Sequence, residues 1–84
     1  MVTVSLHYWA GAKAAAGMEL ETVEASTVAE ALAIAEARRN DSRFRQILNA
    51  SSILVANRVV HGSELSEVLT GPVEVEILPP FAGG

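Results

Sequence analysis

The sequence predicts an α+β domain in which a mixed sheet packs against one main helix. Two observations predict this class. Residues 2–9 and 73–78 alternate apolar and polar side chains with a period of two, which indicates half-buried strands at both ends of the chain. Between them, residues 27–39 carry one long amphipathic pattern with helical spacing. A lone amphipathic helix must bury its apolar stripe against a sheet, which gives a two-layer architecture.

The first two strands are predicted to form a hairpin with a long connection. One face of the first strand is apolar and carries Val2, Val4, Leu6 and Tyr8. The opposite face carries Thr3, Ser5, His7 and Trp9. Residues 10–17 are rich in small side chains and are expected to connect the strands, with room for one helical turn. Residues 18–25 alternate again and are expected to form the second strand.

The main helix has a clear predicted start and end. Thr27 and Glu30 have the spacing of a capping box, in which each side chain accepts a hydrogen bond from the other residue's backbone N–H. The predicted apolar stripe consists of Val28, Ala31, Leu32 and Ala35. Arg38 and Arg39 favour the last turn, and Asn40 ends the helix. Residues 41–49 then predict a short second helix with Phe44, Ile47 and Leu48 facing inward.

The remaining segments read as strands joined by short loops. Residues 52–56 predict a buried strand, Asn57 and Arg58 a turn, and Val59 with Val60 a short return strand. Residues 62–69 predict a loop or one helical turn. The last strand opens at Pro72 and is stopped by Pro79 and Pro80, which cannot donate ladder hydrogen bonds. We therefore expect a domain at residues 1–78 and a flexible tail at residues 79–84.

The composition excludes several classes of function. The 84 residues suffice for one domain, and the absence of cysteine excludes disulfides, thiolate metal sites and a cysteine nucleophile. A net charge of −4 with four aromatic residues argues against nucleic acid as a partner. His7 and His61 have no carboxylates at ligand spacing, so we expect no metal site. No membrane span or secretory signal is apparent, which makes the cytoplasm the expected location.

Four glutamates in the predicted strands, Glu19, Glu21, Glu74 and Glu76, are expected to be solvated. Trp9 is expected on the face opposite the aliphatic side chains, where two placements are equally open. An exposed indole would contribute to a partner surface, whereas a covered one would cap an edge of the core.

The last six residues form the most informative motif: Pro79, Pro80, Phe81, Ala82, Gly83 and Gly84. Glycine has no Cβ, so the final Gly-Gly makes a thin stalk that fits a narrow channel and leaves the terminal carbonyl unshielded. The two prolines favour an extended chain and reduce the entropy cost of inserting it into a partner. Phe81 is expected to be an apolar anchor beside the stalk, and the alternative is a side chain folded back on the core. This motif predicts a terminal carboxylate at Gly84 that is presented to another protein and activated there.

The order of elements and the tail together resemble the β-grasp, or ubiquitin-like, fold, and more narrowly the MoaD/ThiS group of sulfur-carrier proteins. The resemblance is strongest to MoaD, the small subunit of molybdopterin synthase. It rests on Trp9-Ala10 with Lys13 and Gly17, on Thr27-Val28 with Leu32, on residues 54–57, on residues 73–75 and, most specifically, on residues 78–84. Lys13 departs from the arginine more usual there, and residues 69–72 lack the usual Asp-Gly-Asp turn.

This resemblance implies a sulfur donor that is not itself an enzyme. In such carriers an adenylating enzyme related to ubiquitin-activating enzymes uses ATP and Mg²⁺ to convert the carboxylate of the final glycine, here Gly84, into an acyl adenylate. A sulfur donor then produces a thiocarboxylate, and residues 79–83 enter the large subunit of molybdopterin synthase. No cofactor is expected to stay bound. The alternatives are a carrier for thiazole or cysteine synthesis, a protein modifier that forms isopeptide bonds through Gly84, and a binding module with an inert tail.

Overall fold

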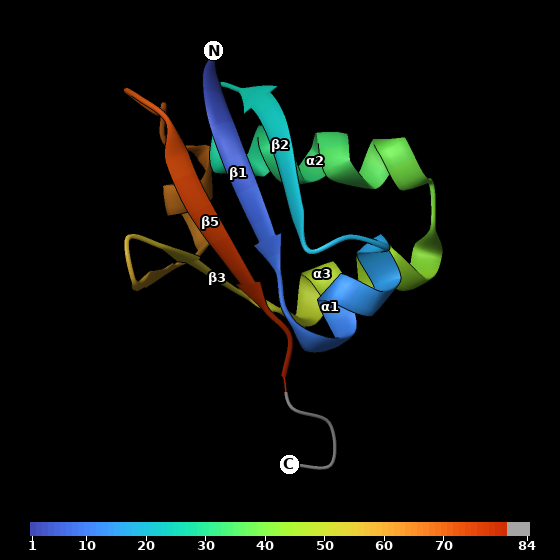
Figure 1. Cartoon of the computed structure of the whole chain (residues 1–84). Helices are drawn as coiled ribbons and strands as arrows, with labels where there is room; N and C mark the ends of the chain where they lie inside the picture. The colour runs from blue at the N-terminus through green and yellow to red at the C-terminus, as the bar shows by residue number, and fades with distance from the viewer. Residues whose placement is uncertain (81–84) are drawn as a thin grey trace.

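The computed structural model describes residues 1–80. Within them, one mixed sheet has the strand order β2-β1-β5-β3-β4 (Figure 1). Its strands are β1 (Val2–Tyr8), β2 (Leu20–Ala25), β3 (Ser52–Val55), β4 (Arg58–Val60) and β5 (Val73–Leu78). β1 and β5 pair in parallel in the middle of the sheet, and the other neighbouring strands are antiparallel. The predicted α+β class and the hairpin of the first two strands are confirmed.

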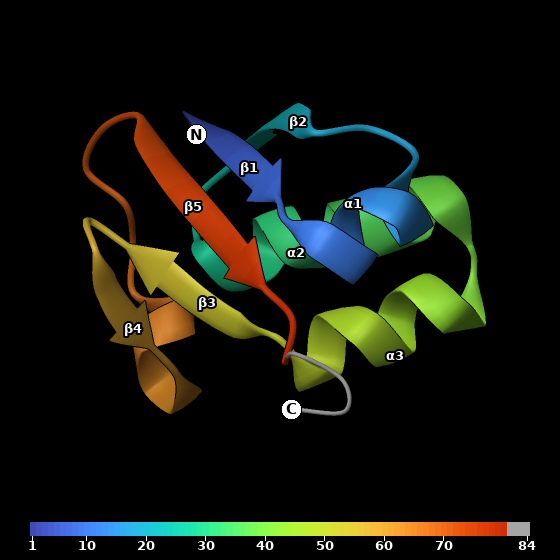
Figure 2. The same cartoon turned by 60° about the horizontal axis from the view of Figure 1, so that its bottom comes forward.

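Helices cover one face of this sheet. They are α1 (Ala10–Ala16), α2 (Val28–Arg39) and α3 (Ser42–Ala50), and a 3₁₀ helix, η1, spans Gly62–Ser66. α2 lies behind the sheet in both Figure 1 and Figure 2, and α1 and α3 lie at the end toward which β1 and β5 run. The opposite face of the sheet carries no helix from residues 1–80 (Figure 2).

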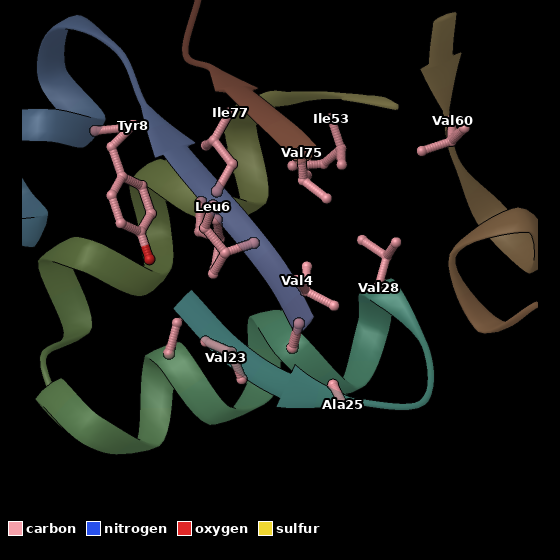
Figure 3. Packing of buried hydrophobic residues seen from close by; sticks show 14 of the residues in the cluster. Val4, Leu6, Tyr8, Val23, Ala25, Val28, Ile53, Val60, Val75 and Ile77 are labelled. Atoms are coloured by element: carbon pink, nitrogen blue, oxygen red, sulfur yellow. The ribbon is translucent and has the colours of Figure 1, made fainter. Parts of the chain in front are cut away.

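The core lies between the sheet and α2. Val4, Leu6 and Tyr8 of β1 and Val75 and Ile77 of β5 are buried side by side, as the alternation predicts (Figure 3). From the predicted helix stripe, Val28, Ala31 and Ala35 are buried and Leu32 is partly buried. The two fully buried alanines have small side chains, which lets the helix approach the sheet closely. α3 contributes Phe44 and Leu48 as predicted, and Ile47 is partly buried.

α1 is longer than the single turn expected from the sequence. Its alanine-rich segment has high helix propensity, and Gly17 ends it in the left-handed conformation at φ 78°. The apolar periodicity that identifies amphipathic helices is weak in a segment made mostly of alanine. The sequence pattern therefore reveals the presence of a helical turn but not the full length of the helix.

The prediction that Glu21 is a solvated position is wrong. Glu21 shares the covered face of β2 with Val23 and Ala25, and its side chain is only 7% exposed. Its carboxylate accepts hydrogen bonds from the Tyr8 hydroxyl at 2.6 Å and from the Arg38 guanidinium at 2.9 Å, and it pairs with Arg39 at 2.9 Å. We call Glu21, Tyr8, Arg38 and Arg39 the Glu21 network.

Electrostatics within the Glu21 network keep Glu21 ionised. Burial opposes the charge, but the hydrogen bonds from Tyr8 and Arg38 and the charge of Arg39 outweigh it and lower the pKa of Glu21 below its ordinary value. Burial, reinforced by the hydrogen bond to Glu21, raises the pKa of Tyr8. The guanidinium of Arg39 also lies 4.6 Å from the centroid of the Phe44 ring, so this network ties β1, β2, α2 and α3 together.

One of the two hydrogen bonds of the predicted capping box is present at the start of α2. The Thr27 hydroxyl accepts a hydrogen bond from the Glu30 backbone N–H at 3.0 Å. The Glu30 carboxylate accepts instead from the N–H of Ser26, one residue before the predicted donor. Both bonds satisfy backbone donors at this helix end.

The turn between β3 and β4 lies one residue earlier than predicted. Val55 pairs with Arg58, which leaves Ala56 and Asn57 as the two loop residues, with φ of 53° and 62°. Positive φ at both positions suits a two-residue hairpin, and asparagine adopts it readily, but alanine does so at a cost. Replacing Ala56 with glycine should therefore stabilise the fold by about 0.5–1 kcal/mol, measured by chemical denaturation.

The matched control is Ala14→Gly, at an exposed position inside α1 where the backbone is helical. Glycine there should destabilise the protein by up to about 1 kcal/mol. If Ala56→Gly destabilised the protein as Ala14→Gly does, the positive φ at Ala56 would not be a source of strain.

Candidate functional site

The predicted tail follows the middle strand of the sheet. β5 ends at Leu78, which pairs with Ser52 of β3. Pro79 is half-buried and Pro80 is exposed. Neither proline has a backbone N–H, so the ladder cannot continue past Leu78 on the donor side. The predicted site residues Phe81, Ala82, Gly83 and Gly84 lie outside the described residues.

β5 ends where α1 begins. Its parallel pairing with β1 runs to Tyr8 opposite Ile77, and the Trp9 backbone N–H then donates to the Ile77 carbonyl at 3.2 Å. Because β1 and β5 run in the same direction, the N-terminus lies at the opposite end of the sheet (Figure 1). The chain after Leu78 thus starts at the end of the domain formed by α1, the last turn of α3 and the start of β3.

Trp9 lies beside this end of β5, on the sheet face that α2 does not cover. Its side chain is partly exposed, at 43%, which favours the first of the two placements left open by the sequence. The indole N–H donates to a carboxylate oxygen of Glu76 at 2.6 Å. The His7 ring stacks beside the indole with centroids 4.3 Å apart and a tilt of 30°. The role of Trp9 in a partner surface stays a prediction.

A shallow groove of about 820 Å³ runs along the uncovered face next to Trp9. Leu54, Pro72 and Leu78 provide apolar walls, and Glu74 and Glu76 add two carboxylates. Glu74 is exposed as predicted, whereas Glu76 is partly buried by Trp9 and His7. The groove therefore combines an aromatic side chain, apolar walls and negative charge at the place where the predicted tail begins.

The grouping of His7, Trp9 and Glu76 is absent from the sequence prediction. It depends on the parallel register that places His7 opposite Glu76. The alternation in each strand correctly puts these residues on the outer face, but it does not specify which strand is the neighbour or how the two are aligned. Recognising β1 and the last strand as parallel partners would have supplied the missing information.

No group of three or more histidine, aspartate or glutamate side chains in residues 1–80 is arranged to hold a metal ion. None of the helices described there combines the length and apolar character needed to cross a membrane.

No protein-family model and no curated protein matches the chain. Several solved structures match the chain. A small archaeal modifier protein 1 from Methanosarcina acetivorans aligns with a TM-score of 0.80 at 20% identity, covering 100% of this chain and 98% of the other. A candidate molybdopterin converting factor, subunit 1, from Pyrococcus furiosus aligns with a TM-score of 0.76 at 22% identity, covering 96% and 100%.

A third match is subunit 1 of the molybdopterin-converting factor of Helicobacter pylori, solved in complex with subunit 2. It aligns with a TM-score of 0.69 at 20% identity, covering 98% of this chain and 99% of the other. The chain has the β-grasp fold. The predicted resemblance to MoaD-like, ubiquitin-like carriers is thus confirmed at the level of the fold, and this β-grasp domain spans the full length of those structures.

Proposed function

We propose that this chain is a sulfur carrier, the small subunit of a molybdopterin synthase, whose Gly84 carboxylate is adenylated and converted to a thiocarboxylate. The observation that carries the proposal is the position of the Pro-Pro-Phe-Ala-Gly-Gly segment. It follows directly on the middle strand of a β-grasp domain whose structural neighbours include molybdopterin converting factor subunits. Nothing in the proposed role requires this chain to catalyse a reaction, because it donates sulfur stoichiometrically.

The chemistry explains why the tail carries no reactive side chain. A carboxylate is a poor electrophile, so one Gly84 oxygen attacks the α-phosphate of ATP in the activating enzyme, with Mg²⁺ on the phosphates, and pyrophosphate leaves. A sulfur nucleophile then attacks the acyl carbon and AMP leaves. The resulting thiocarboxylate keeps an anionic sulfur, the nucleophilic form. The chain has no cysteine, so Gly84 is the attachment point for sulfur in this proposal.

The tail suits delivery to a partner. Six extended residues from Pro79 to Gly84 span at most about 20 Å, which matches insertion into the active site of a second protein. Pro79 and Pro80 limit the conformations available at its base, and Phe81 offers an apolar anchor beside the stalk. In this proposal Ala82 and Gly83 form the narrow part that passes through the channel.

Two protein partners follow from this proposal. One is the large subunit of the synthase, in keeping with the Helicobacter pylori structure, in which subunit 1 is bound to subunit 2. The other is an adenylating enzyme related to ubiquitin-activating enzymes, which supplies the bound ATP and Mg²⁺. The exposed face of Trp9 and the groove beside it are the surface that we propose these partners contact.

The synthase role is tested by sulfur transfer in vitro. Thiocarboxylated chain is mixed with a molybdopterin synthase large subunit and the cyclic pyranopterin precursor, and dithiolene formation is measured. We expect two carriers to be consumed for each product, because each holds one sulfur and a dithiolene needs two. The unmodified chain is the control. Thiocarboxylated chain that binds the large subunit and transfers no sulfur would contradict the synthase role.

A second candidate function is protein modification. The high structural similarity to the small archaeal modifier protein 1 of Methanosarcina acetivorans favours it. In this role the activated Gly84 acylates lysine amines of other proteins, and conjugates of higher mass accumulate in the source cell. Tagging the N-terminus, which lies at the far end of the sheet from the end of β5, allows such conjugates to be isolated (Figure 1). A carrier for thiazole or cysteine synthesis would instead transfer sulfur to the precursors of those pathways.

A further inference from the structure

Trp9 is joined to the end of β5 through both its side chain and its backbone. The indole N–H donates to Glu76 at 2.6 Å, and the backbone N–H donates to the Ile77 carbonyl at 3.2 Å. His7 supports the arrangement, with its Nδ1 at 3.4 Å from the same Glu76 oxygen and its ring against the indole. We call Trp9, Glu76 and His7 the Trp9 latch.

The Trp9 backbone also belongs to the start of α1. Its carbonyl accepts hydrogen bonds from the Ala12 and Lys13 N–H groups, at 2.9 Å and 3.3 Å, so Trp9 is the residue on which the helix starts. On this side of β5 the ladder with β1 stops at Tyr8 opposite Ile77. The hydrogen bonds from Trp9 are therefore the last that hold this side of β5 before the chain reaches Leu78 and Pro79.

We propose that Trp9 is a positioning residue, whose hydrogen bond to Glu76 fixes the direction in which the chain leaves β5 and thereby orients the tail for activation. This inference rests on the proposed carrier function. It differs from the partner surface proposed above, because the latch uses the N–H edge of the indole whereas a partner would contact its exposed face.

The physical reason is preorganisation. The tail must place its carboxylate in an active site, and the rate of activation falls when the base of the tail adopts directions in which the carboxylate cannot react. A misplacement of about 1 Å at a reacting group can lower the rate about 100-fold. The prolines stiffen residues 79 and 80, so the direction of the tail depends on how firmly residues 76–78 are held. A charged acceptor such as Glu76 makes the indole hydrogen bond stronger than a neutral pair would be.

The first test measures the base of the tail without any partner. Leu78 has the last backbone N–H before the two prolines, so ¹⁵N relaxation of this amide reports on local order. Trp9→Phe keeps a six-membered aromatic ring at this position, but it removes the N–H donor together with the five-membered ring of the indole. We expect increased fast motion at Leu78 in Trp9→Phe and in Glu76→Ala, and recovery in Glu76→Gln, whose amide oxygen can still accept. Glu24→Ala, an exposed position on β2, is the matched control and should leave Leu78 unchanged.

The second test measures activation of Gly84 by the adenylating enzyme. Trp9→Phe should lower kcat roughly tenfold, about the effect of losing one hydrogen bond to a charged group, with a smaller change in KM because part of the aromatic face remains. The double variant Trp9→Phe/Glu76→Ala should be no slower than either single variant, because both remove the same bond. Trp9→Ala, which also loses the ring face, should raise KM as well.

The results separate the two proposals. Unchanged Leu78 motion in Trp9→Phe, or fully additive effects of Trp9→Phe and Glu76→Ala on kcat, would overturn the positioning role. Failure of the native chain to form a thiocarboxylate would overturn the carrier function, and the relaxation of Leu78 would still decide whether the latch orders the base of the tail.

Discussion

Deleting Gly84 should abolish thiocarboxylation of this chain while leaving its fold intact. The deletion shortens the tail by about 3.3 Å, and a misplacement of even about 1 Å at a reacting group can cost about 100-fold in rate. All the strands and helices of the domain end by Leu78 within the described residues, so we expect the same thermal unfolding midpoint as for the native chain. The measurement is the rate of thiocarboxylate formation with activating enzyme, Mg-ATP and a sulfur source.

Gly84→Ala is the matched variant for this deletion. It keeps the chain length and the carboxylate, but it places a Cβ next to the carbonyl that must be attacked. We expect a rate between those of the native chain and the deletion variant. Thiocarboxylation of the deleted chain at the native rate would contradict the assignment of Gly84 as the attachment point.

Replacing Glu21 with alanine should strongly destabilise the fold. The substitution leaves the Arg39 side chain, only 12% exposed, without its carboxylate partner, and it removes the acceptor of the Tyr8 hydroxyl. Removing one partner of a buried ion pair typically costs about 3–5 kcal/mol. Since Arg38 is about half exposed, we expect a loss of about 3 kcal/mol, a large fraction of a typical domain stability of about 5–15 kcal/mol.

The pH dependence distinguishes the charge of Glu21 from its packing. The pKa of this carboxyl is lower in the folded protein than its ordinary value of 4.5, so ionised Glu21 stabilises the fold at neutral pH. This contribution is fully present above the ordinary pKa and is lost as the pH falls through the lowered folded pKa. The stability difference between the native chain and Glu21→Gln should therefore be largest near neutral pH and shrink in acid.

Chemical denaturation across this pH range is the measurement, and Glu24→Ala is the control. Glu24 lies on the same strand but is exposed and accepts a hydrogen bond only from the Thr3 hydroxyl among the described contacts. We expect Glu24→Ala to change stability by less than about 0.5 kcal/mol at every pH. A Glu21→Gln effect that stayed constant down to acid pH would show that packing, rather than charge, explains the burial of Glu21.

The sequence was sufficient to predict the strands and the main helix because their burial repeats with a regular period. Val4, Leu6 and Tyr8 are buried as the alternation of β1 predicts, and Ala31 and Ala35 as the helical spacing predicts. Glu21 breaks this logic, because its charge predicts solvent exposure while its place in the alternation predicts burial. Glu21 is buried because it pairs with Arg38 and Arg39, which lie seventeen and eighteen residues further along the chain. A local sequence pattern does not reveal such distant partners.

One part of the candidate site could likewise be predicted from the sequence, and another part could not. The tail from Pro79 to Gly84 is predicted from its residue types alone, because prolines and glycines act through the backbone, and its role stays a prediction. The contact between Trp9 and Glu76 joins residues 67 positions apart and arises from the parallel pairing of β1 with β5. Long-range register of this kind follows from the fold as a whole. The sequence therefore predicted Trp9 on the outer face, with an exposed indole as one of two options, but it did not predict its partner Glu76.

The measurement that tests the carrier function most directly is the intact mass of the chain after incubation with Mg-ATP, a sulfide source and a MoeB-type activating enzyme. We expect the mass increase of one oxygen-to-sulfur exchange, which fragmentation assigns to Gly84, and no increase when ATP is omitted. An unchanged mass, with an enzyme shown to be active on its own carrier, would contradict the proposal that this β-grasp domain carries sulfur.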